Sequence, residues 1–420
     1  MTPKQLILVV FVGAYIALGR QLVRWTGRRR DVVFGLLTLV AVFSVFFTTN
    51  DADLHYSKIY CLFFIAYLAF VSVQYLALRN WGERTDWRVW GAFLTPIAFL
   101  IIVRSVPPSA VASFARALRH KSHVYHGGGY YFLGLSYLAF RTSSLAVEVR
   151  NGRVKCPGFW DYLGFAFFLP TLSVGPITPY SEYHRAFTQT DRPAIPSGRA
   201  LLRILVGAVK FAFLAPLLSQ LTYSSLLLDG RWHHWMDLVI AVLVYYPYLY
   251  CNFSGFCDIA VGCAGLMGIS MLENFDNPFA ARNMKELWNR WHIGLSLWMR
   301  DYVFSPLSKT LVRAWGPAAV NHAIAATILV VFLLVGLWHA VSWNFVAFGV
   351  MNAVGVATTH YYSILLKKRL GKEGIASYNC NVIIRMIAMM LTYVYFSASM
   401  FFFANDIEAI KQIWFTLLWR

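Results

Sequence analysis

Residues 323–338 read AIAATILVVFLLVGLW, an uninterrupted apolar stretch without a charged side chain. A helix rises about 1.5 Å per residue, so this stretch and its flanks approach the thickness of a bilayer's hydrocarbon core, about 30 Å. Together with this stretch, the apolar runs of the chain lie near residues 5–19, 32–49, 57–78, 89–106, 130–148, 201–228, 236–257, 322–340, 343–366 and 382–404. The sequence therefore predicts an all-α, polytopic integral membrane protein with about 10–11 transmembrane helices.

The composition of the 420 residues indicates the same class. Hydrophobic residues make up 58% of the chain and charged residues only 13%, against about 25% charged in soluble domains. A soluble fold has too little interior for so much apolar surface, and a disordered chain needs the opposite composition.

The basic residues indicate an orientation. The chain has 37 Lys and Arg against 19 Asp and Glu, and the basic residues gather in short loops between apolar runs. Because such loops stay on the cytoplasmic side, the excess indicates topology and not nucleic-acid binding. Loop 20–30 carries five arginines, which predicts an N-terminus outside the cell. The cytoplasmic loops are then 79–88, 149–158, 178–200, 272–320 and 367–372; the basic loop 104–129 falls outside and breaks the pattern.

Two apolar segments contain helix-breaking residues. Residues 159–177 include Pro170, Gly175 and Pro176, and residues 258–271 are rich in glycine. Broken backbone at membrane depth must be buried in protein or line a cavity, so both segments are predicted to be re-entrant. A charge inside run 130–148, Arg141, is expected to pair with Glu148 on the same helix.

The stretch 274–307 is crowded with Trp, Arg and His. Helical spacing predicts one apolar stripe of Trp288, Trp291, Leu295 and Trp298 beside a polar stripe of Asn289, His292 and Ser296. Such a helix would lie on the inner membrane surface or line a cavity entrance. An ordinary interfacial helix, with His292 as a structural hydrogen-bonding residue, explains the same pattern.

Two other places put polar groups at the end of an apolar run. His339 follows residues 323–338, and Asp258 closes the island NFSGFCD at 252–258. An ionisable group at membrane depth is costly and is a functional candidate, and histidine exchanges protons near neutral pH. A structural hydrogen bond for His339, or a helix end at the interface for Asp258, remains the alternative.

Metal and nucleotide chemistry have little support. The six cysteines form no CxxC pair, and the histidines at 120, 123 and 126 have no neighbouring thiol or carboxylate. We therefore predict no metal site. The sequence also has no phosphate-binding loop, nucleophile elbow or zinc-protease motif, which argues against a pump or a hydrolase of those types.

Three strings resemble the membrane-bound O-acyltransferase family. They are NFSGFCDIAVG at 252–262, ENFDNPFAARNMKELWNRWHIGLSLWMRDYVF at 273–304 and GLWHAVSWNFVAFG at 336–349. Residues 130–152 and 159–180 narrow the resemblance to the bacterial branch that transfers D-alanine to teichoic acids. Ala340 departs from the family's usual glycine. Because no low-complexity tract or long linker appears, we predict a single domain over 1–420. The resemblance covers most of residues 130–420 and implies that they form the core, a ring of helices around a central tunnel with re-entrant and interfacial helices, while 1–129 form peripheral helices.

The resemblance also implies the reaction. An acidic acyl carrier protein in the cytoplasm presents an acyl thioester on a phosphopantetheine arm, and the acyl group, best assigned as D-alanyl, reaches a hydroxyl of a cell-envelope polymer such as teichoic acid. No cofactor is bound tightly, no nucleic acid takes part, and the location is the bacterial cytoplasmic membrane. One alternative is acetyl transfer from acetyl-CoA or another acetyl donor to exopolysaccharide or lipopolysaccharide. A proton-coupled transporter is the other, although no internal repeat supports it.

The family's two histidines match His292 and His339. We predict His339 as the general base on the acceptor hydroxyl, and His292 at the thioester, orienting the donor or stabilising the oxyanion. Supporting positions are Asn252, Ser254, Asp258, Trp288, Asn289, Arg290, Trp291, Ser296, Trp298, Arg300, Asp301, Trp338, Ser342 and Trp343. Carrier docking is predicted at Val303, Phe304, Leu307, Lys309, Leu311 and Arg313, where apolar side chains stand beside cations; simple membrane anchoring is the alternative.

Overall fold

A computed structural model describes residues 3–50, 57–84, 86–105, 134–188, 196–229 and 231–418. All regular elements in these ranges are helices, which confirms the all-α prediction. The chain divides into two compact units. Unit 1 comprises residues 1–205 and 257–272, and unit 2 comprises residues 206–256 and 273–420. The histidines at 120, 123 and 126 and most of loop 104–129 lie outside the described residues.

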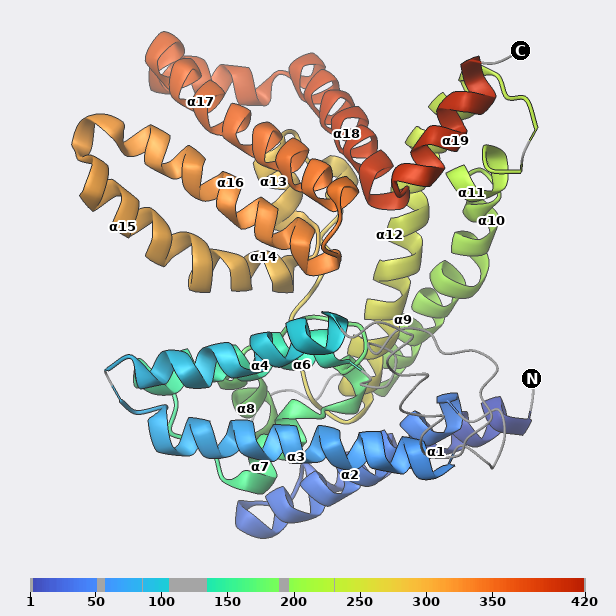
Figure 1. Cartoon of the computed structure of the whole chain (residues 1–420), viewed down its shortest axis with the longest axis vertical. Coiled ribbons are helices and arrows are strands. Elements are labelled where there is room, and N and C mark those ends of the chain that lie inside the picture. Colours follow the sequence, from blue (N-terminus) through green and yellow to red (C-terminus); the bar gives the residue numbers. More distant parts are fainter. Residues whose placement is uncertain are drawn as a thin grey trace. The chain divides into compact units, whose positions relative to one another are not determined.

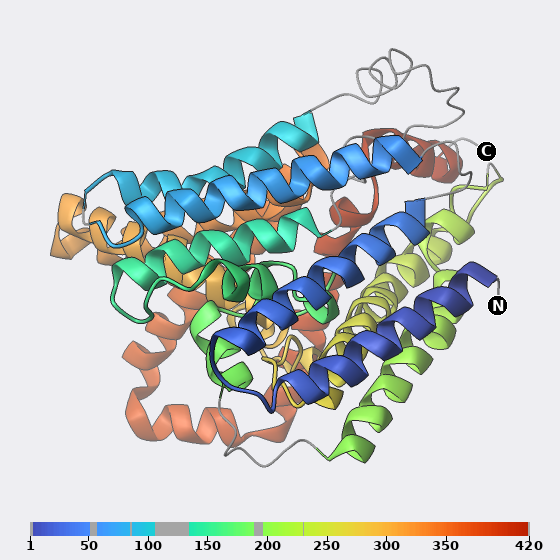
Figure 2. The ribbon, with the colours of Figure 1, turned by 90° about the horizontal axis from the view of Figure 1, so that it is seen from below.

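Unit 1 is built from consecutive helices that pack side by side (Figures 1 and 2). They are α1 (Pro3–Leu22), α2 (Gly27–Asn50), α3 (Ser57–Trp81), α4 (Arg88–Ser105), α6 (Leu135–Arg150), α7 (Phe159–Ala166) and α8 (Tyr180–Thr188). Helices α9 (Ser197–Val209) and α12 (Trp235–Leu266) contribute residues to both units.

Unit 2 holds the second half of the chain. Its short helices are α10 (Ala215–Ser219), α11 (Tyr223–Leu226), α13 (Met284–Arg290) and α14 (Ile293–Met299). Its other helices are α15 (Ser305–Trp315), α16 (Val320–His339), α17 (Trp343–Cys380), α18 (Val382–Ala404) and α19 (Ile407–Leu418). Helices α15 to α18 pack in chain order, and α17 bends sharply at Gly371 before it reaches α18 (Figure 1).

Four helical stretches of the described chain are long and apolar enough to cross a membrane. They are Ser197–Leu226, Trp235–Leu266, Pro317–His339 and Val382–Ala404. Helices also occupy other predicted runs, including α1 to α4 and the first part of α17. The protein is thus an all-α polytopic membrane protein, and the total of 10–11 crossings stays a prediction.

The two glycine- and proline-containing segments behave differently. Helix α7 ends at Ala166 and a short 3-10 turn follows at Leu169–Thr171, so the predicted break near Pro170 is present. By contrast, α12 continues without interruption to Leu266, and the predicted break at its glycines is wrong for that part. Gly262 instead lets the backbone of Ala200 in α9 approach closely, since a Cβ atom at position 262 would lie 2.9 Å from the Ala200 carbonyl oxygen.

The expected pair between Arg141 and Glu148 does not form. The Arg141 guanidinium, which is fully buried, donates to the Phe165 carbonyl at 3.2 Å and to the Thr171 hydroxyl at 2.7 Å. Glu148 instead accepts from Ser181, from its hydroxyl at 2.5 Å and from its backbone N–H at 3.2 Å. The Arg141 guanidinium therefore supplies donors to oxygens of the broken segment that follows α7, and not to a carboxylate on its own helix.

Hydrogen bonds join several of the loops that are predicted to share one side of the membrane. Arg20 donates to the Ser197 hydroxyl at 2.8 Å, and the Tyr75 hydroxyl donates to the Pro157 carbonyl at 3.2 Å. The first contact joins the loop regions 20–30 and 178–200, and the second joins α3 to the loop region 149–158, all within unit 1. The assignment of these loops to one side of the membrane stays a prediction.

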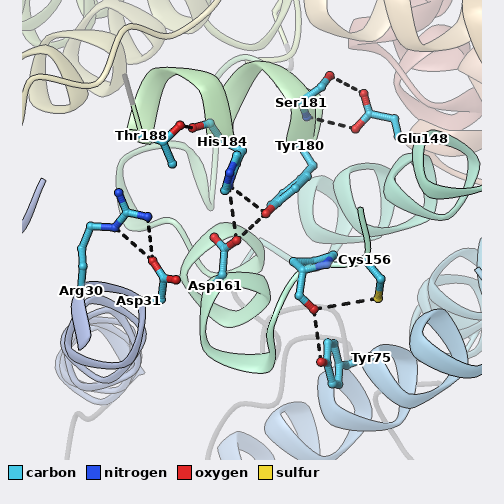
Figure 3. A network of polar contacts seen from close by, with 11 residues as sticks. Arg30, Asp31, Tyr75, Glu148, Cys156, Asp161, Tyr180, Ser181, His184 and Thr188 are labelled. Atoms are coloured by element: carbon cyan, nitrogen blue, oxygen red, sulfur yellow. Dashed lines mark hydrogen bonds and ion pairs between the residues drawn. The ribbon is translucent and has the colours of Figure 1, made fainter. Parts of the chain in front are cut away.

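A cluster of polar side chains joins α7 to α8 in unit 1 (Figure 3). The Tyr180 hydroxyl donates to the Asp161 carboxylate, and the Nδ1 atom of His184 lies 2.9 Å from that hydroxyl and 3.4 Å from the carboxylate. Burial, followed by the charge of Asp161, raises the pKa of Tyr180, so this hydroxyl remains protonated and acts as the donor. Sequence patterns did not identify the cluster because Asp161 lies 19 residues before Tyr180 in the chain.

Candidate active site

The backbone turns sharply at His292. Helix α13 begins after Asn283, whose side chain accepts the Glu286 N–H at 2.8 Å, and it ends at Arg290. His292 then adopts left-handed backbone angles (φ 45°, ψ 52°) before α14 begins at Ile293. The predicted single helix with continuous stripes is therefore wrong, and His292 stands at a break between two short helices.

Distant backbone contacts impose this break. Phe275 and Trp291 form an isolated antiparallel bridge, and the Ile293 N–H donates to the Asn274 carbonyl at 2.9 Å. The side-chain oxygen of Asn274, a buried residue, also accepts the Gly294 N–H at 3.1 Å. An Asn side chain thus satisfies a donor at the start of α14, as a helix cap does.

The same Asn274 oxygen determines which nitrogen of His292 carries the proton. It lies 3.1 Å from Nδ1, and because it already accepts the Gly294 N–H, Nδ1 must donate. The other nitrogen, Nε2, is then a bare acceptor. It is buried and has no hydrogen-bond partner among the described residues. His292 therefore presents a proton acceptor to the interior, and in this form it cannot donate to an oxyanion.

Burial also fixes the charge of His292. Burial first, and the nearby His339 second, lower the pKa of His292 to about 3. The ring is neutral throughout the physiological range. It therefore suits an orienting hydrogen bond better than a proton shuttle, which needs a pKa near the working pH.

This pKa predicts acid sensitivity. An unfolded histidine binds a proton near pH 6.5, whereas folded His292 stays neutral down to about pH 3, so protons favour the unfolded chain in this window. The free energy of unfolding should fall with decreasing pH by up to about 1.4 kcal/mol per unit more than in His292→Gln. Melting curves of both proteins in detergent from pH 7 to 4.5 measure the difference; parallel curves would contradict a neutral, buried His292.

His339 is the last residue of α16 and sits among aromatic rings. Its ring centroid lies 4.5 Å from that of Trp338, 4.8 Å from Phe403 and 5.6 Å from Phe345. Trp338 is also 6.3 Å from the His292 ring. The structure thus brings the two predicted histidines and Trp338 into one cluster, within unit 2.

Close helix packing holds His339 in place. A Cβ atom added at Gly336 in α16 would lie 2.2 Å from the carbonyl oxygen of Phe345. A Cβ atom added at Gly349 in α17 would lie 2.6 Å from the carbonyl oxygen of Phe332. Only glycine permits this approach of the two backbones, which brings α17 against the end of α16. Ser342, in the turn between the helices, donates to Asn344 at 2.6 Å.

The tryptophans of the motif are structural supports. Trp288, Trp291 and Trp298 are buried, and the Trp288 N–H donates to Asn352 at 3.1 Å. Arg290 pairs with Glu286 at 3.1 Å and with Asp276 at 3.6 Å. These contacts tie α13 to α17 and to the segment that contains Asn274.

Other predicted residues lie apart from the histidines. Asn289, Arg300, Asp301 and Trp343 are exposed, and Arg300 pairs with Asp301 at 2.8 Å. Asp258 belongs to unit 1, where it pairs with Arg203 at 3.1 Å. In unit 2, Asn252 is half-buried, and the buried hydroxyl of Ser254 has no partner among the described residues.

A cavity of about 370 Å³ in unit 2 runs along α16, and we call it the α16 cavity. Its wall includes Ile324, Ile328, Val331, Phe332 and Val335, the last of which precedes His339 by about one helical turn. Polar lining residues are Lys285, Asn289, Ser296, Arg300 and His360. The volume and the mixed lining are typical of small-molecule sites.

Sequence patterns missed two buried amides that hold this site. Asn274 orients His292, and Asn352 joins Trp288 to α17. Asn352 stands within an apolar helix, and a polar residue at membrane depth needs a specific partner, so its position is a signal in the sequence. For Asn274 only its position within the family-like string offers a signal. No group of three potential metal ligands occurs in the described ranges.

Comparisons with known proteins identify the family. The model of the membrane-bound O-acyltransferase family matches residues 42–401. The teichoic acid D-alanyltransferase of Streptococcus thermophilus is 30% identical over 301 residues, 68% of this chain and 70% of that protein. The teichoic acid D-alanyltransferase of Bacillus subtilis is 27% identical over 88% of this chain and 90% of its own length. The probable alginate O-acetylase of Azotobacter vinelandii is 26% identical over 54% of this chain and 44% of its own. The chain belongs to the membrane-bound O-acyltransferase family and is an acyltransferase.

Proposed function

We propose that this protein transfers a D-alanyl group from a carrier-protein thioester to a hydroxyl of teichoic acid or a similar envelope polymer. The observation that carries the proposal is the pairing of a neutral, acceptor-only His292 with His339 across Trp338, one turn beyond the α16 cavity. The names of the two similar D-alanyltransferases support the choice of acyl group and polymer.

The proposed chemistry divides the work between the histidines. His339 takes the proton of the acceptor hydroxyl as its oxygen attacks the thioester carbonyl carbon. When the carbon–sulfur bond breaks, the proton returns to the departing thiolate, leaving an ester and a free thiol. The bare Nε2 of His292 accepts a hydrogen bond from an N–H or O–H of the donor or acceptor and holds it in line. His292 does not stabilise the oxyanion in this scheme, because its Nε2 has no proton to donate.

The donor end of the reaction fits the α16 cavity. Lys285, Arg300 and His360 supply basic groups among its lining residues, and apolar side chains of α16 continue toward His339. A pantetheine arm has a phosphate at one end and an extended, weakly polar chain, so its chemistry matches this lining. Loops 272–320 and 367–372 are basic, which supports a cytoplasmic position for this entrance and an N-terminus outside.

Deleting the gene and restoring it on a plasmid tests the proposal. We expect base-labile D-alanine esters of the envelope to disappear and to return with the wild-type chain but not with His339→Ala. Acetate released from the same samples serves as the comparison. Loss of acetate esters with D-alanine unchanged would favour O-acetylation, which the similarity to the probable alginate O-acetylase keeps as the second candidate.

The surface of α15 and of the short π-helix before it (Arg300–Phe304) is the proposed docking site of the carrier. Val303, Phe304, Leu307 and Leu311 are partly buried, while Lys309 and Arg313 are exposed. Phe304 also lines the α16 cavity, so a carrier bound here would have its arm at the entrance.

Leu307→Glu is expected to weaken carrier binding about tenfold, since it places a negative charge against an acidic partner and removes an apolar contact. The matched control is Gln412→Glu, the same charge change at an exposed position of α19. Binding of an apo carrier to the purified proteins measures both. Equal affinity of the two variants would remove the docking site from α15.

A further inference from the structure

A second cavity in unit 2 takes no part in the proposed reaction. It measures about 480 Å³ and lies between α17, α18 and the start of α13, and we call it the basic pocket. Its charged lining residues are Arg282 and Arg385, and none of the described residues that line it is acidic. Hydroxyl groups of Thr358, Thr359, Tyr362, Ser363 and Tyr378 also belong to the lining.

The two arginines are placed to hold an anion. The Nε atom of Arg282 donates to Glu286 at 3.2 Å, which fixes this guanidinium at the wall. Arg385 lies in the first turn of α18, and no carboxylate of the described ranges is within ion-pair distance of it. A guanidinium with an uncompensated charge is a favourable partner for phosphate oxygens.

The bend of α17 builds the pocket. Gly371 has φ 63°, a left-handed angle that glycine adopts without strain, and the chain turns there. The turn brings Tyr378 back to Tyr362, where the two hydroxyls lie 3.0 Å apart. The basic pocket is therefore a consequence of the fold around Gly371 and not a chance gap in a straight helix.

An apolar groove continues from the basic pocket along α17. Val354, Ala357, Thr358, Tyr361, Tyr362 and Leu365 line this groove. Three of them, Val354, Thr358 and Tyr362, also line the basic pocket. Val354 and Leu365 are 52% and 47% exposed, so the groove offers apolar surface to the surroundings. A basic pocket that opens into an apolar groove matches an amphiphile with an anionic head.

The position along the helices agrees with a lipid at the membrane surface. Helix α18 is a candidate span that begins at Val382, so Arg385 stands near its water-facing end. Lys367, Lys368 and Arg369 precede the bend and are exposed. Clusters of basic residues next to a span bind anionic lipids of the cytoplasmic leaflet.

We propose that the basic pocket binds the phosphate headgroup of an anionic phospholipid, with one acyl chain in the groove of α17. The charge of Arg385 selects the anionic head, with Arg282, which Glu286 holds in place, at the same wall. The groove selects a lipid over a free phosphate ester. This site is separate from the histidine cluster and does not depend on which acyl group the enzyme transfers.

Native mass spectrometry of the detergent-purified chain tests the proposal, with phosphatidylglycerol and phosphatidylcholine of identical acyl chains as probes. We expect phosphatidylglycerol to be retained in preference to phosphatidylcholine. Loss of a charged hydrogen bond in Arg385→Gln should lower its retention about tenfold. Lys368→Gln is the matched control, because it removes the same charge from a position of α17 that does not line the pocket. An equal loss in both variants would mean general electrostatic attraction and would overturn the site.

A second arm separates the two sources of phosphate. Glycerol 3-phosphate carries the head without the tails and should not displace the lipid at equal concentration. Ala357→Phe fills the groove and should lower retention while leaving the basic pocket intact. Displacement by glycerol 3-phosphate together with unchanged retention in Ala357→Phe would overturn the lipid assignment. Melting temperatures of all variants exclude a loss through unfolding.

Discussion

His339→Ala is expected to lower acyl transfer by about 10²- to 10⁴-fold in a purified, folded protein, the range that a general base contributes. The hydroxyl of a sugar or polyol is a weak nucleophile until its proton leaves, and His339 is a titratable side chain that packs on the Trp338 ring beside His292. Single-turnover transfer from an acylated carrier to a soluble acceptor measures the loss directly.

The aromatic cage around His339 makes a second variant useful. Alanine leaves a void among Trp338, Phe345 and Phe403, whereas His339→Gln fills much of it without a group that titrates near neutral pH. Both variants should lose activity alike. His322→Ala, at the opposite end of the same helix, is the matched control, since the His322 ring packs on Tyr361 and its Nδ1 lies 2.9 Å from the Tyr361 hydroxyl. Full activity in folded His339→Gln would overturn the role of base.

Long apolar runs could be predicted from the sequence because the bilayer restricts their structure to helices. The run at 323–338 and the one at 382–404 appear as α16 and α18 within a few residues. Family-like strings likewise singled out His292 and His339 as candidate site residues, although nothing in their spacing requires them to meet. Their meeting depends on Trp338, which contacts both rings.

The break at His292 could not be predicted from periodicity. Trp288, Trp291 and Trp298 do follow helical spacing and are all buried, but Trp291 is outside either helix and packs against Phe275 and Tyr246. The extended segment at Asn274, 18 residues before His292, bonds to this stretch of backbone and overrides its local preference for a helix. Arg141 is a similar case, because its partners come from a broken segment and not from its own helix.

Asn274→Ala is expected to lower the rate of acyl transfer by about 10²-fold, although Asn274 is a positioning residue. Alanine removes the acceptor for both the Gly294 N–H and the His292 Nδ1–H, leaving two buried donors unpaired at a cost of about 1–3 kcal/mol each. The left-handed turn at His292 then loses the contacts that hold it, and Nε2 is free to turn away from the reacting groups.

Asn274→Asp separates positioning from stability. A carboxylate keeps both acceptor interactions, so we expect partial rescue of the rate relative to Asn274→Ala. Its negative charge also favours protonated His292, so the activity of Asn274→Asp should fall at a higher pH than that of the wild type on the acid side. If Asn274 had only a structural role, Asn274→Asp would change the melting temperature but not the pH at which activity falls on the acid side. Wild-type kcat in folded Asn274→Ala would contradict the assignment. An unchanged KM for the carrier with reduced kcat would place the defect at the turn of His292 and away from α15.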